Sequence, residues 1–359
     1  MAKERLFDLP ETKGTFQIRG KVTGHDKDNF YKEIKTKTGK PFRRTSFGVT
    51  YEPNKTMYIN LQGMPQDNVY FSKPGKDGKK GETKPIPWAD RFTYVEDGFR
   101  MIGNNIGVTK SVNEKGEYEN DRKILTDFDA VKEIADHLKD DDSVFVKGKL
   151  EYSSFTNDKG EKRNSVKLVP NQVSLCKSEI NFNDEQFNPA HEFTQVIVFT
   201  GIDQEKEDDK PTGRFIVTAD IVNYGSIEEA EFFITNTTMA KQFRKSLSPY
   251  NAIKVWGEMA VSEQVDEVES DDIWGTANKM ERQSSPVKRE YIITGADPGS
   301  IDKDTYSESS IAAAKMKVKN AQDAKNDFGS MSNDESSTDN SAWGSVLSTV
   351  EDDEDDVPW

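Results

Sequence analysis

Basic and aromatic side chains are interleaved in residues 70–94, which read YFSKPGKDGKKGETKPIPWADRFTY. The candidate binding residues in this stretch are Lys73, Lys79, Lys80, Lys84, Trp88 and Arg91. Aromatic rings can stack on nucleic-acid bases while Lys and Arg contact the phosphates, so these residues could bind a single nucleic-acid strand non-covalently. Glycines and prolines predict a loop that is too long to be a simple connector. This loop either closes over a nucleic-acid strand as a clamp or is an insertion whose Trp88 and Phe92 dock on the folded domain that carries it.

Further candidates come from segments in which polar and apolar residues alternate, a pattern that predicts half-buried strands. If the apolar residues point inward, the outward candidates are Arg19, Lys21, Tyr58, Phe145, Lys147 and Lys149, and Arg43 and Arg44 open a further strand. Two alternatives stay open. Tyr58 and Phe145 either contact bases or pack under an insertion or in a subunit interface, and any single Lys or Arg can be an ordinary solvated side chain.

The elements that would position these residues follow a recognisable order. Three alternating segments, around Phe16, Phe47 and Met57, precede a predicted helix that begins at the Thr126 N-cap, and two more strands follow. This order is typical of the oligonucleotide-binding (OB) fold, a five-stranded Greek-key barrel, here with the helix between strands 3 and 4.

A second copy of this pattern follows the first. Shifting the chain by 109 residues superimposes the helix and the next strand of the first copy on those of the second, including Gly148 on Gly257. The sequence therefore predicts a mainly β protein with tandem OB-folds and a disordered acidic tail.

The predicted organisation has five parts. A first barrel at 1–178 carries the main binding surface and a long insertion at 64–125, and a second barrel follows at 190–300. A helix at 301–325 either packs against the second barrel or frays. A disordered linker at 326–350 leads to an acidic partner-binding tip at 351–359.

Charge is segregated along the chain. The net charge is −15, yet residues 1–178 carry 33 Lys and Arg against 27 Asp and Glu, whereas the rest carries 16 against 37. Since polyanion affinity comes from local basic surface, the first barrel is the expected binding unit. In the second barrel, Phe233 and Trp256 are expected to serve packing more than binding.

Several function classes are disfavoured by composition. A single cysteine, Cys176, and three scattered histidines disfavour a disulfide and a zinc site, so no metal and no cofactor is expected. The carboxylates fall in loops and a tail, where a metal-dependent nuclease could not preorganise them, so no enzyme is expected. No apolar run reaches the roughly 18 residues of a membrane span, and a cytoplasmic protein is predicted, in the host cell if the source is viral.

The chain ends in a short acidic motif with an aromatic tip, EDDEDDVPW. The candidate partner-binding residues are Asp352, Asp353, Asp355, Asp356, Val357, Pro358 and Trp359. The aromatic tip and terminal carboxylate suit a pocket ringed by Lys and Arg, and the acidic run would steer the approach.

This tail resembles that of bacterial single-stranded DNA-binding proteins, which end in Asp-Asp-x-Pro-Phe, with Trp359 in place of the phenylalanine. The body departs from the bacterial pattern of one barrel per chain and is more similar to the variants encoded by bacterial viruses. The resemblance implies coating of single-stranded DNA in replication, recombination and repair. It also implies recruitment of a polymerase, primase, helicase, recombinase or nuclease through the tail.

Two further questions stay open at this stage. The chain could instead be an acidic interaction protein or DNA mimic that regulates replication proteins without coating DNA, although the basic first half argues against that class. The sequence is compatible with a homo-oligomer and does not specify one.

Overall fold

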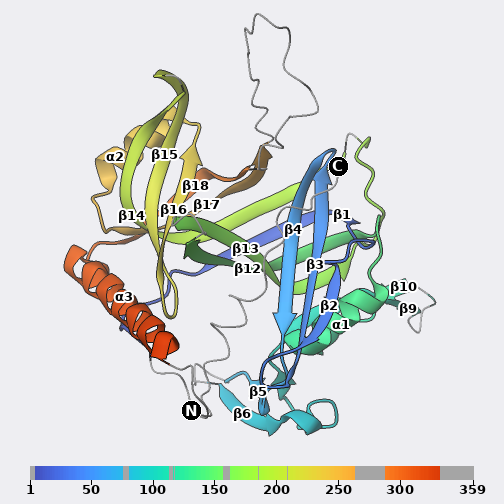
Figure 1. Cartoon of the computed structure of the whole chain (residues 1–359). Helices are drawn as coiled ribbons and strands as arrows, with labels where there is room; N and C mark the ends of the chain where they lie inside the picture. Colours follow the sequence, from blue (N-terminus) through green and yellow to red (C-terminus); the bar gives the residue numbers. More distant parts are fainter. Residues whose placement is uncertain are drawn as a thin grey trace, which may run out of the picture.

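The structure is a computed structural model that describes residues 5–75, 81–112, 116, 118–156, 162–184, 186–207, 209–262 and 288–331. The fold is mainly β, as the sequence predicts. Two strand-rich lobes lie side by side, with the helix α3 beside the second lobe (Figure 1).

The first lobe is a closed ring of five strands. Its elements are β1 (Gly14–Thr23), β3 (Pro41–Glu52), β4 (Lys55–Gly63), α1 (Asp127–His137), β12 (Ser143–Thr156) and β13 (Lys162–Leu175). The strand β1 pairs with β3 and β12, β3 pairs with β4, and β12 pairs with β13. A parallel contact between β13 and β4, with Leu168 opposite Ile59, closes the ring. The helix α1 lies between the third and fourth strands in the sequence.

Burial along these elements follows from their residue types. Phe16 and Ile18 on β1 and Ile59 on β4 are buried. Gln17 on β1 and Tyr58 and Asn60 on β4, which alternate with them, are partly exposed, as a side-chain period of two requires. The helix α1 begins where the Thr126 hydroxyl oxygen accepts the Asp129 backbone N–H at 3.2 Å. The apolar side of α1 then packs into the end of the ring.

The second lobe repeats the same ring. Its elements are β14 (Ala190–Glu207), β15 (Lys210–Val222), β16 (Ile227–Ile234), α2 (Thr237–Ser246), β17 (Ala252–Ser262) and β18 (Lys288–Asp302). The strand β14 pairs with β15 and β17, β15 pairs with β16, β17 pairs with β18, and a parallel contact between Phe233 and Ile292 joins β16 to β18. The strand order and helix position match those of the first lobe.

Two glycines occupy equivalent positions in the two rings. Gly148 lies opposite Phe16, and Gly257 lies opposite Phe193. A Cβ atom at Gly148 would be 2.7 Å from Phe16 Cε1 and closer still to the Val169 carbonyl oxygen. A Cβ at Gly257 would be 2.8 Å from the Ile292 carbonyl carbon. Both positions therefore require glycine because another strand passes too close, which gives a physical reason for their alignment in the two copies.

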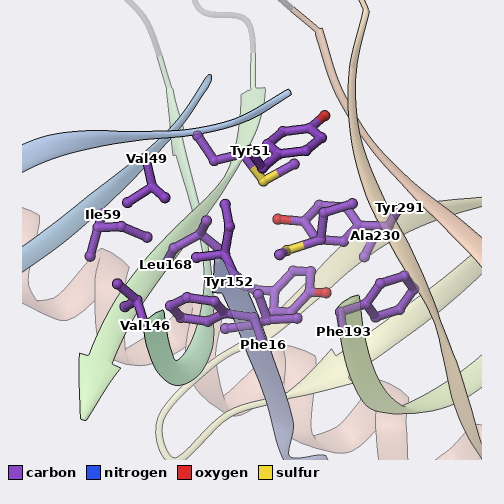
Figure 2. Packing of buried hydrophobic residues seen from close by; sticks show 14 of the residues in the cluster. Phe16, Val49, Tyr51, Ile59, Val146, Tyr152, Leu168, Phe193, Ala230 and Tyr291 are labelled. Carbon is purple, nitrogen blue, oxygen red and sulfur yellow. The ribbon is translucent and has the colours of Figure 1, made fainter. Parts of the chain in front are cut away.

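The two lobes share one sheet and one core. The strand β1 pairs with β14 in an antiparallel ladder in which Phe16 faces Phe193. Figure 2 shows Phe16, Tyr152, Phe193 and Tyr291 gathered where the lobes meet. The ring centroids of Phe193 and Tyr291 are 5.3 Å apart, in an edge-to-face arrangement. The two lobes are thus fused along β1 and β14, in addition to the covalent connection through residues 176–189.

The insertion 64–125 contains regular secondary structure, which corrects the prediction of a loop at 70–94. It contains β5 (Asn68–Lys73), β6 (Glu82–Pro87), the short 3-10 helix η1 (Trp88–Asp90), β7 (Arg100–Met101), β8 (Asn104–Gly107), β9 (Lys110–Val112), β10 (Tyr118–Asn120) and β11 (Lys123–Leu125). A small sheet has the order β6-β5-β7, so Pro85 and Pro87 lie on an edge strand, where proline is tolerated. Prolines that suggested a loop are compatible with this hairpin. A further short strand, β2 (Tyr31–Lys35), pairs with β3.

The C-terminal helix α3 (Glu308–Met331) packs against the second lobe. Ile311 and Ala314 are buried with Phe7 and Tyr306, and the Lys315 ammonium is 2.8 Å from the buried Asp220 carboxylate. Of the two expectations for this helix, packing describes its first half. The helix also continues six residues into the predicted linker 326–350, since each added helical residue gains a backbone hydrogen bond. The remaining linker and the tip 351–359 lie outside the described residues.

Candidate nucleic-acid interface

The outer surface of β3 and β4 carries polar, aromatic and basic residues. Their inward neighbours Phe47, Ile59 and Leu61 are buried. The outward set on the two strands is Arg44, Ser46, Gly48, Tyr58, Asn60 and Gln62. Arg44 lies opposite Gln62, Ser46 opposite Asn60, and Gly48 opposite Tyr58, so the set forms rows across the strand pair.

Tyr58 lies in the last of these rows, and the residue opposite it has no side chain. Its cross-strand partner is Gly48, at which a Cβ atom would lie 2.6 Å from Thr23 Cγ2 and 2.7 Å from Thr56 Cγ2. The close approach of the two threonines excludes a larger residue at Gly48, so no side chain from position 48 covers the tyrosine ring. The Lys27 ammonium, from the turn after β1, lies 5.8 Å from the centre of the ring. A partly exposed ring beside a cation suits base stacking next to a phosphate.

Two further cations lie on the same surface as Tyr58. The parallel register that sets Leu168 beside Ile59 places Lys167 next to Tyr58 on the outer side of the ring. Arg44 lies two rows further along, beside Lys32 of β2. Within the described part of the chain, Lys27, Arg44 and Lys167 form no ion pair. Their charges are therefore available to an incoming anion.

Other predicted cations are already held by carboxylates. The Arg43 Nε atom is 2.9 Å from Glu33, with the guanidinium 3.8 Å above the Phe128 ring. The Lys149 ammonium is 2.5 Å from Glu151. A phosphate would have to displace these carboxylates or be repelled by them, so the geometry disfavours Arg43 and Lys149 as primary contacts.

The insertion shows the same pairing. The Lys84 ammonium is 2.6 Å from Glu96, whose hydrogen bond raises the pKa of Lys84. The Lys73 ammonium donates to the Asp97 backbone carbonyl at 2.9 Å and lies over the Phe99 ring. Lys79 and Lys80 lie outside the described residues.

Trp88 and Arg91 attach the insertion to the helix α1. The Arg91 guanidinium contacts both Asp129 carboxylate oxygens, at 2.8 and 3.1 Å, and stacks on the Trp88 ring. The Trp88 ring meets the Phe128 ring edge-on, with the centroids 6.1 Å apart. Of the two expectations for this segment, docking describes Trp88. Phe92 is 58% exposed and does not dock in this way.

The outward positions of β1 and β12 form a separate surface. Phe145 lies opposite Arg19, and both line a hollow together with the connecting segment 176–189. The Arg19 guanidinium lies 5.2 Å from the Phe187 ring and donates to the Asn188 carbonyl. The connection between the lobes thus engages Arg19 and borders Phe145.

The lysines on this side are more accessible. Lys147 is exposed and its ammonium lies 5.3 Å from the Phe145 ring, and Lys21 lies opposite Ser143 without an ion pair among the described residues. These two lysines are secondary candidates because they are on strands other than β3 and β4.

Two side chains at the β2–β3 edge of this surface, Tyr31 and Glu33, keep one ionisation state each at neutral pH. Burial, followed by the hydrogen bond to Glu33, raises the pKa of Tyr31 to about 12. The hydrogen bond from Tyr31 and then that from Arg43 lower the pKa of Glu33. Tyr31 is therefore neutral and Glu33 ionised at neutral pH, which keeps Arg43 bound to Glu33.

The second lobe presents a weaker candidate surface. Phe233 is 2% exposed and belongs to the core, whereas Trp256 is 41% exposed and lies against Gly295 of β18. Glu258, two residues from Trp256 on the same strand face, lies opposite Glu192 of β14. These carboxylates would repel phosphates from the surroundings of Trp256.

Two searches of the described residues bear on other functions. No group of three or more His, Cys, Asp or Glu side chains in these residues is arranged to hold a metal ion. None of the helices in the described ranges combines the length and the apolar character needed to cross a membrane. The seven predicted residues of the tip, Asp352 to Trp359, lie outside these ranges.

The sequence reasoning did not identify Lys27, Lys167, Asn60 and Gln62 as members of the surface around Tyr58. Asn60 and Gln62 follow from the same alternation that places Tyr58 outward. Lys27 and Lys167 reach Tyr58 only through the turn after β1 and the parallel contact of β13 with β4, and no local pattern signals either.

Comparisons with known proteins add a family and two structural likenesses. The family model described as YorF matches residues 77–330, well over half of the chain. No curated protein matches the sequence. Two solved structures of the single-stranded DNA binding protein from Thermus aquaticus, the wild-type protein and a deletion mutant, each align with a TM-score of 0.38 and 11% identity. The alignments cover 80% of this chain and 93% and 94% of those two chains, respectively.

Proposed function

This chain belongs to the YorF family, and we propose that it binds single-stranded DNA on the outer surface of β3 and β4. The observation that carries the proposal is the setting of Tyr58. Its ring stands opposite a glycine and beside Lys27 and Lys167, with Arg44 two rows along the same surface, and none of these cations has a carboxylate partner among the described residues.

The strand order supports the choice of this surface. We propose that each lobe is an OB-fold, because its ring joins the first strand to the second and fourth, and the third to the fifth, with a helix before the fourth. OB-folds bind oligonucleotides on their second and third strands and on the loops after the first and fourth. In the first lobe these strands are β3 and β4, and Lys27 belongs to the loop after the first strand.

Two interactions account for binding at this surface. One base stacked on Tyr58 contributes roughly 1–3 kcal/mol. Each cation that neutralises a phosphate releases counterions, which makes the affinity depend on salt. Both interactions are indifferent to base identity, so the expected activity is coating without strong sequence preference. The acidic second lobe is assigned a supporting role, through its shared sheet and core with the first.

The wider biological role rests on the sequence. We propose that the protein coats and protects single-stranded DNA in replication, recombination and repair, and that it has no catalytic activity. A bacteriophage origin and a cytoplasmic location, in the host cell, agree with the resemblance of the tail. Through the tip 351–359, with Trp359 as the anchor, the chain would recruit polymerase, primase, helicase, recombinase or nuclease partners.

The DNA-binding proposal is tested by competition between single and double strands. Fluorescein-labelled oligo-dT bound to the full chain should be displaced by unlabelled oligo-dT and only poorly by a duplex of equal length, because duplex bases are already stacked and cannot reach Tyr58. Equal competition by the duplex would show general attraction to phosphates and refute stacking at Tyr58. Absence of binding at low salt would instead favour an acidic interaction protein or DNA mimic.

The recruitment proposal has a separate test. Deleting 351–359 should leave oligo-dT binding unchanged or slightly tighter, because a competing polyanion is removed, and should abolish capture of purified replication partners. A second variant replaces Trp359 with alanine and keeps all six acidic residues; it should also lose partner capture, while its oligo-dT binding matches that of the wild type. If the truncated chain captures the same partners, the tip does not recruit them.

A further inference from the structure

We infer that the small sheet β6-β5-β7 carries a second contact for the same DNA strand, formed by Tyr70 and Arg100. This inference rests on the proposed function and lengthens its site. The sheet follows directly from β4, the strand that carries Tyr58, and lies beside α1 at the end of the first lobe (Figure 1).

The sheet has one packed side and one open side. On β5, Val69 and Phe71 are buried, at 5% and 6% exposure, whereas Tyr70 between them is 54% exposed. Arg100 pairs with Ser72, which shares the face of Tyr70, and Arg100 is also exposed. A sheet with one solvated face commonly places polar residues there, and an exposed tyrosine beside an arginine adds the two groups that bind a nucleotide.

The open side carries no carboxylate at its outward strand positions. These positions are Asn68, Tyr70, Ser72, Thr83, Pro85, Pro87 and Arg100. Two nearby acids, Glu82 and Glu96, lie on the other side, 3.7 and 2.6 Å from the Lys84 ammonium. Within the described ranges Arg100 forms no ion pair. The open side is therefore positively charged and complementary to phosphates.

The open side lies within reach of the first surface. The strand β4 ends at Gly63, and β5 begins at Asn68, so only four residues separate the two strands. Tyr70 follows Tyr58 by twelve residues, and a fully extended chain of that length spans at most about 40 Å. The two residues therefore lie no further apart than that. One oligonucleotide of moderate length can therefore reach both rings, whereas a short one occupies a single surface.

The attachment of the insertion makes this second contact rigid. The two Arg91–Asp129 hydrogen bonds and the Trp88–Phe128 ring contact hold η1, which follows β6 directly, against α1. On the other side, Asn104 of β8 donates to the Asp127 carboxylate at 2.6 Å. A preorganised platform loses little conformational entropy when a strand binds, so more of the stacking energy appears as affinity.

The test compares two oligonucleotide lengths on the full chain. Fluorescence anisotropy is measured with labelled oligo-dT of about 8 and about 30 nucleotides, since one barrel covers roughly 4–16. The variant Tyr70→Ala/Arg100→Ala should bind the long oligonucleotide about 5- to 100-fold more weakly and the short one within about twofold of wild type. The control Tyr118→Ala/Arg122→Ala, which removes an exposed tyrosine and arginine elsewhere in the insertion, should match wild type at both lengths.

The outcomes separate this inference from the proposed function. Wild-type affinity of the Tyr70→Ala/Arg100→Ala variant for the long oligonucleotide overturns the second contact and leaves the first surface standing. An equal loss at both lengths also overturns it, because Tyr70 would then belong to the first surface. If wild-type protein binds neither length at low salt, the proposed function itself fails, and the second contact fails with it.

Discussion

Replacing Tyr58 by alanine isolates the stacking interaction on which DNA binding is proposed to depend. The ring is partly exposed, lies on the outer side of the strand and faces Gly48, so its removal leaves no unfilled core and breaks no side-chain contact with β3. The neighbours Met57 and Ile59, which point into the barrel, are unchanged. We therefore expect the free energy of unfolding to fall by less than about 1 kcal/mol, as for other surface substitutions.

The expected effect on binding follows from one lost stack. Stacking of one base contributes roughly 1–3 kcal/mol, and a tenfold change in affinity corresponds to about 1.4 kcal/mol. The dissociation constant for oligo-dT should therefore rise about 5- to 150-fold. The Lys27 ammonium, 5.8 Å from the ring centre, remains available to the phosphates, so binding weakens without disappearing.

The assay is a titration of labelled oligo-dT followed by fluorescence anisotropy, with thermal unfolding recorded on the same samples. Tyr58→Phe keeps the ring and should bind within about threefold of wild type, because stacking needs only the aromatic face. Tyr118→Ala removes a tyrosine that is 77% exposed on β10 and should have no effect. Unchanged affinity of Tyr58→Ala, with a normal melting curve, would refute the assignment of the binding surface.

Three further predictions concern salt, packing and pH. Arg44→Ala should reduce the magnitude of the slope of log affinity against log salt by about 0.7. Lys84→Ala should leave the slope unchanged, because Glu96 already neutralises the Lys84 charge. Equal effects of the two substitutions would contradict the sorting of cations by ion pairing. Gly148→Ala should lower the free energy of unfolding in urea by about 1–3 kcal/mol, because the new methyl group meets the β13 backbone, and an unchanged midpoint would contradict that close approach. Burial raises the pKa of Tyr291 to about 12, above the usual tyrosine value of 10.0, so its stabilising contribution is complete below pH 10 and is lost as pH rises from about 10 towards 12. Urea titrations between pH 9 and 11 with tyrosinate absorbance should show that loss, and constant stability would refute it.

Local patterns predicted much of the first barrel. The alternation around Met57, Ile59 and Leu61 is enough to place Tyr58 outward, because strand side chains alternate with a period of two. The Thr126 N-cap and the apolar spacing after it are likewise local features, and the helix α1 begins one residue later. The alignment of Gly148 with Gly257 also reflected a shared constraint, the close passage of another strand.

Long-range contacts set the limits of that reasoning. Arg43, Lys84 and Arg91 looked equivalent to Arg44 in the sequence, yet each meets a carboxylate that the fold brings near. For Arg91 that partner is Asp129, 38 residues away. The ladder between β1 and β14 could not be expected from either barrel alone, since each edge is a property of the assembled ring.

The insertion shows a different limit. Its strands are short and contain Pro85 and Pro87, so period-two alternation is brief and turn-forming residues dominate the local pattern. In the described sheet β6 pairs with β5 on one side only, so it is an edge strand and can contain prolines that a central strand would exclude. The same pairing exposes Tyr70, which local reasoning counted as one aromatic residue of a loop.

The most direct measurement of the central claim is the affinity of the full-length chain for oligo-dT across a series of salt concentrations. If β3 and β4 bind a single strand through Tyr58 and the cations of this surface that form no ion pair with the described residues, binding should be saturable at low salt. Log affinity should then fall linearly with log salt, with a slope of about −0.7 for each phosphate neutralised. Three cations at Lys27, Arg44 and Lys167 set a minimum slope of about −2. An absence of binding at low salt, or an affinity that does not change with salt, would contradict the account.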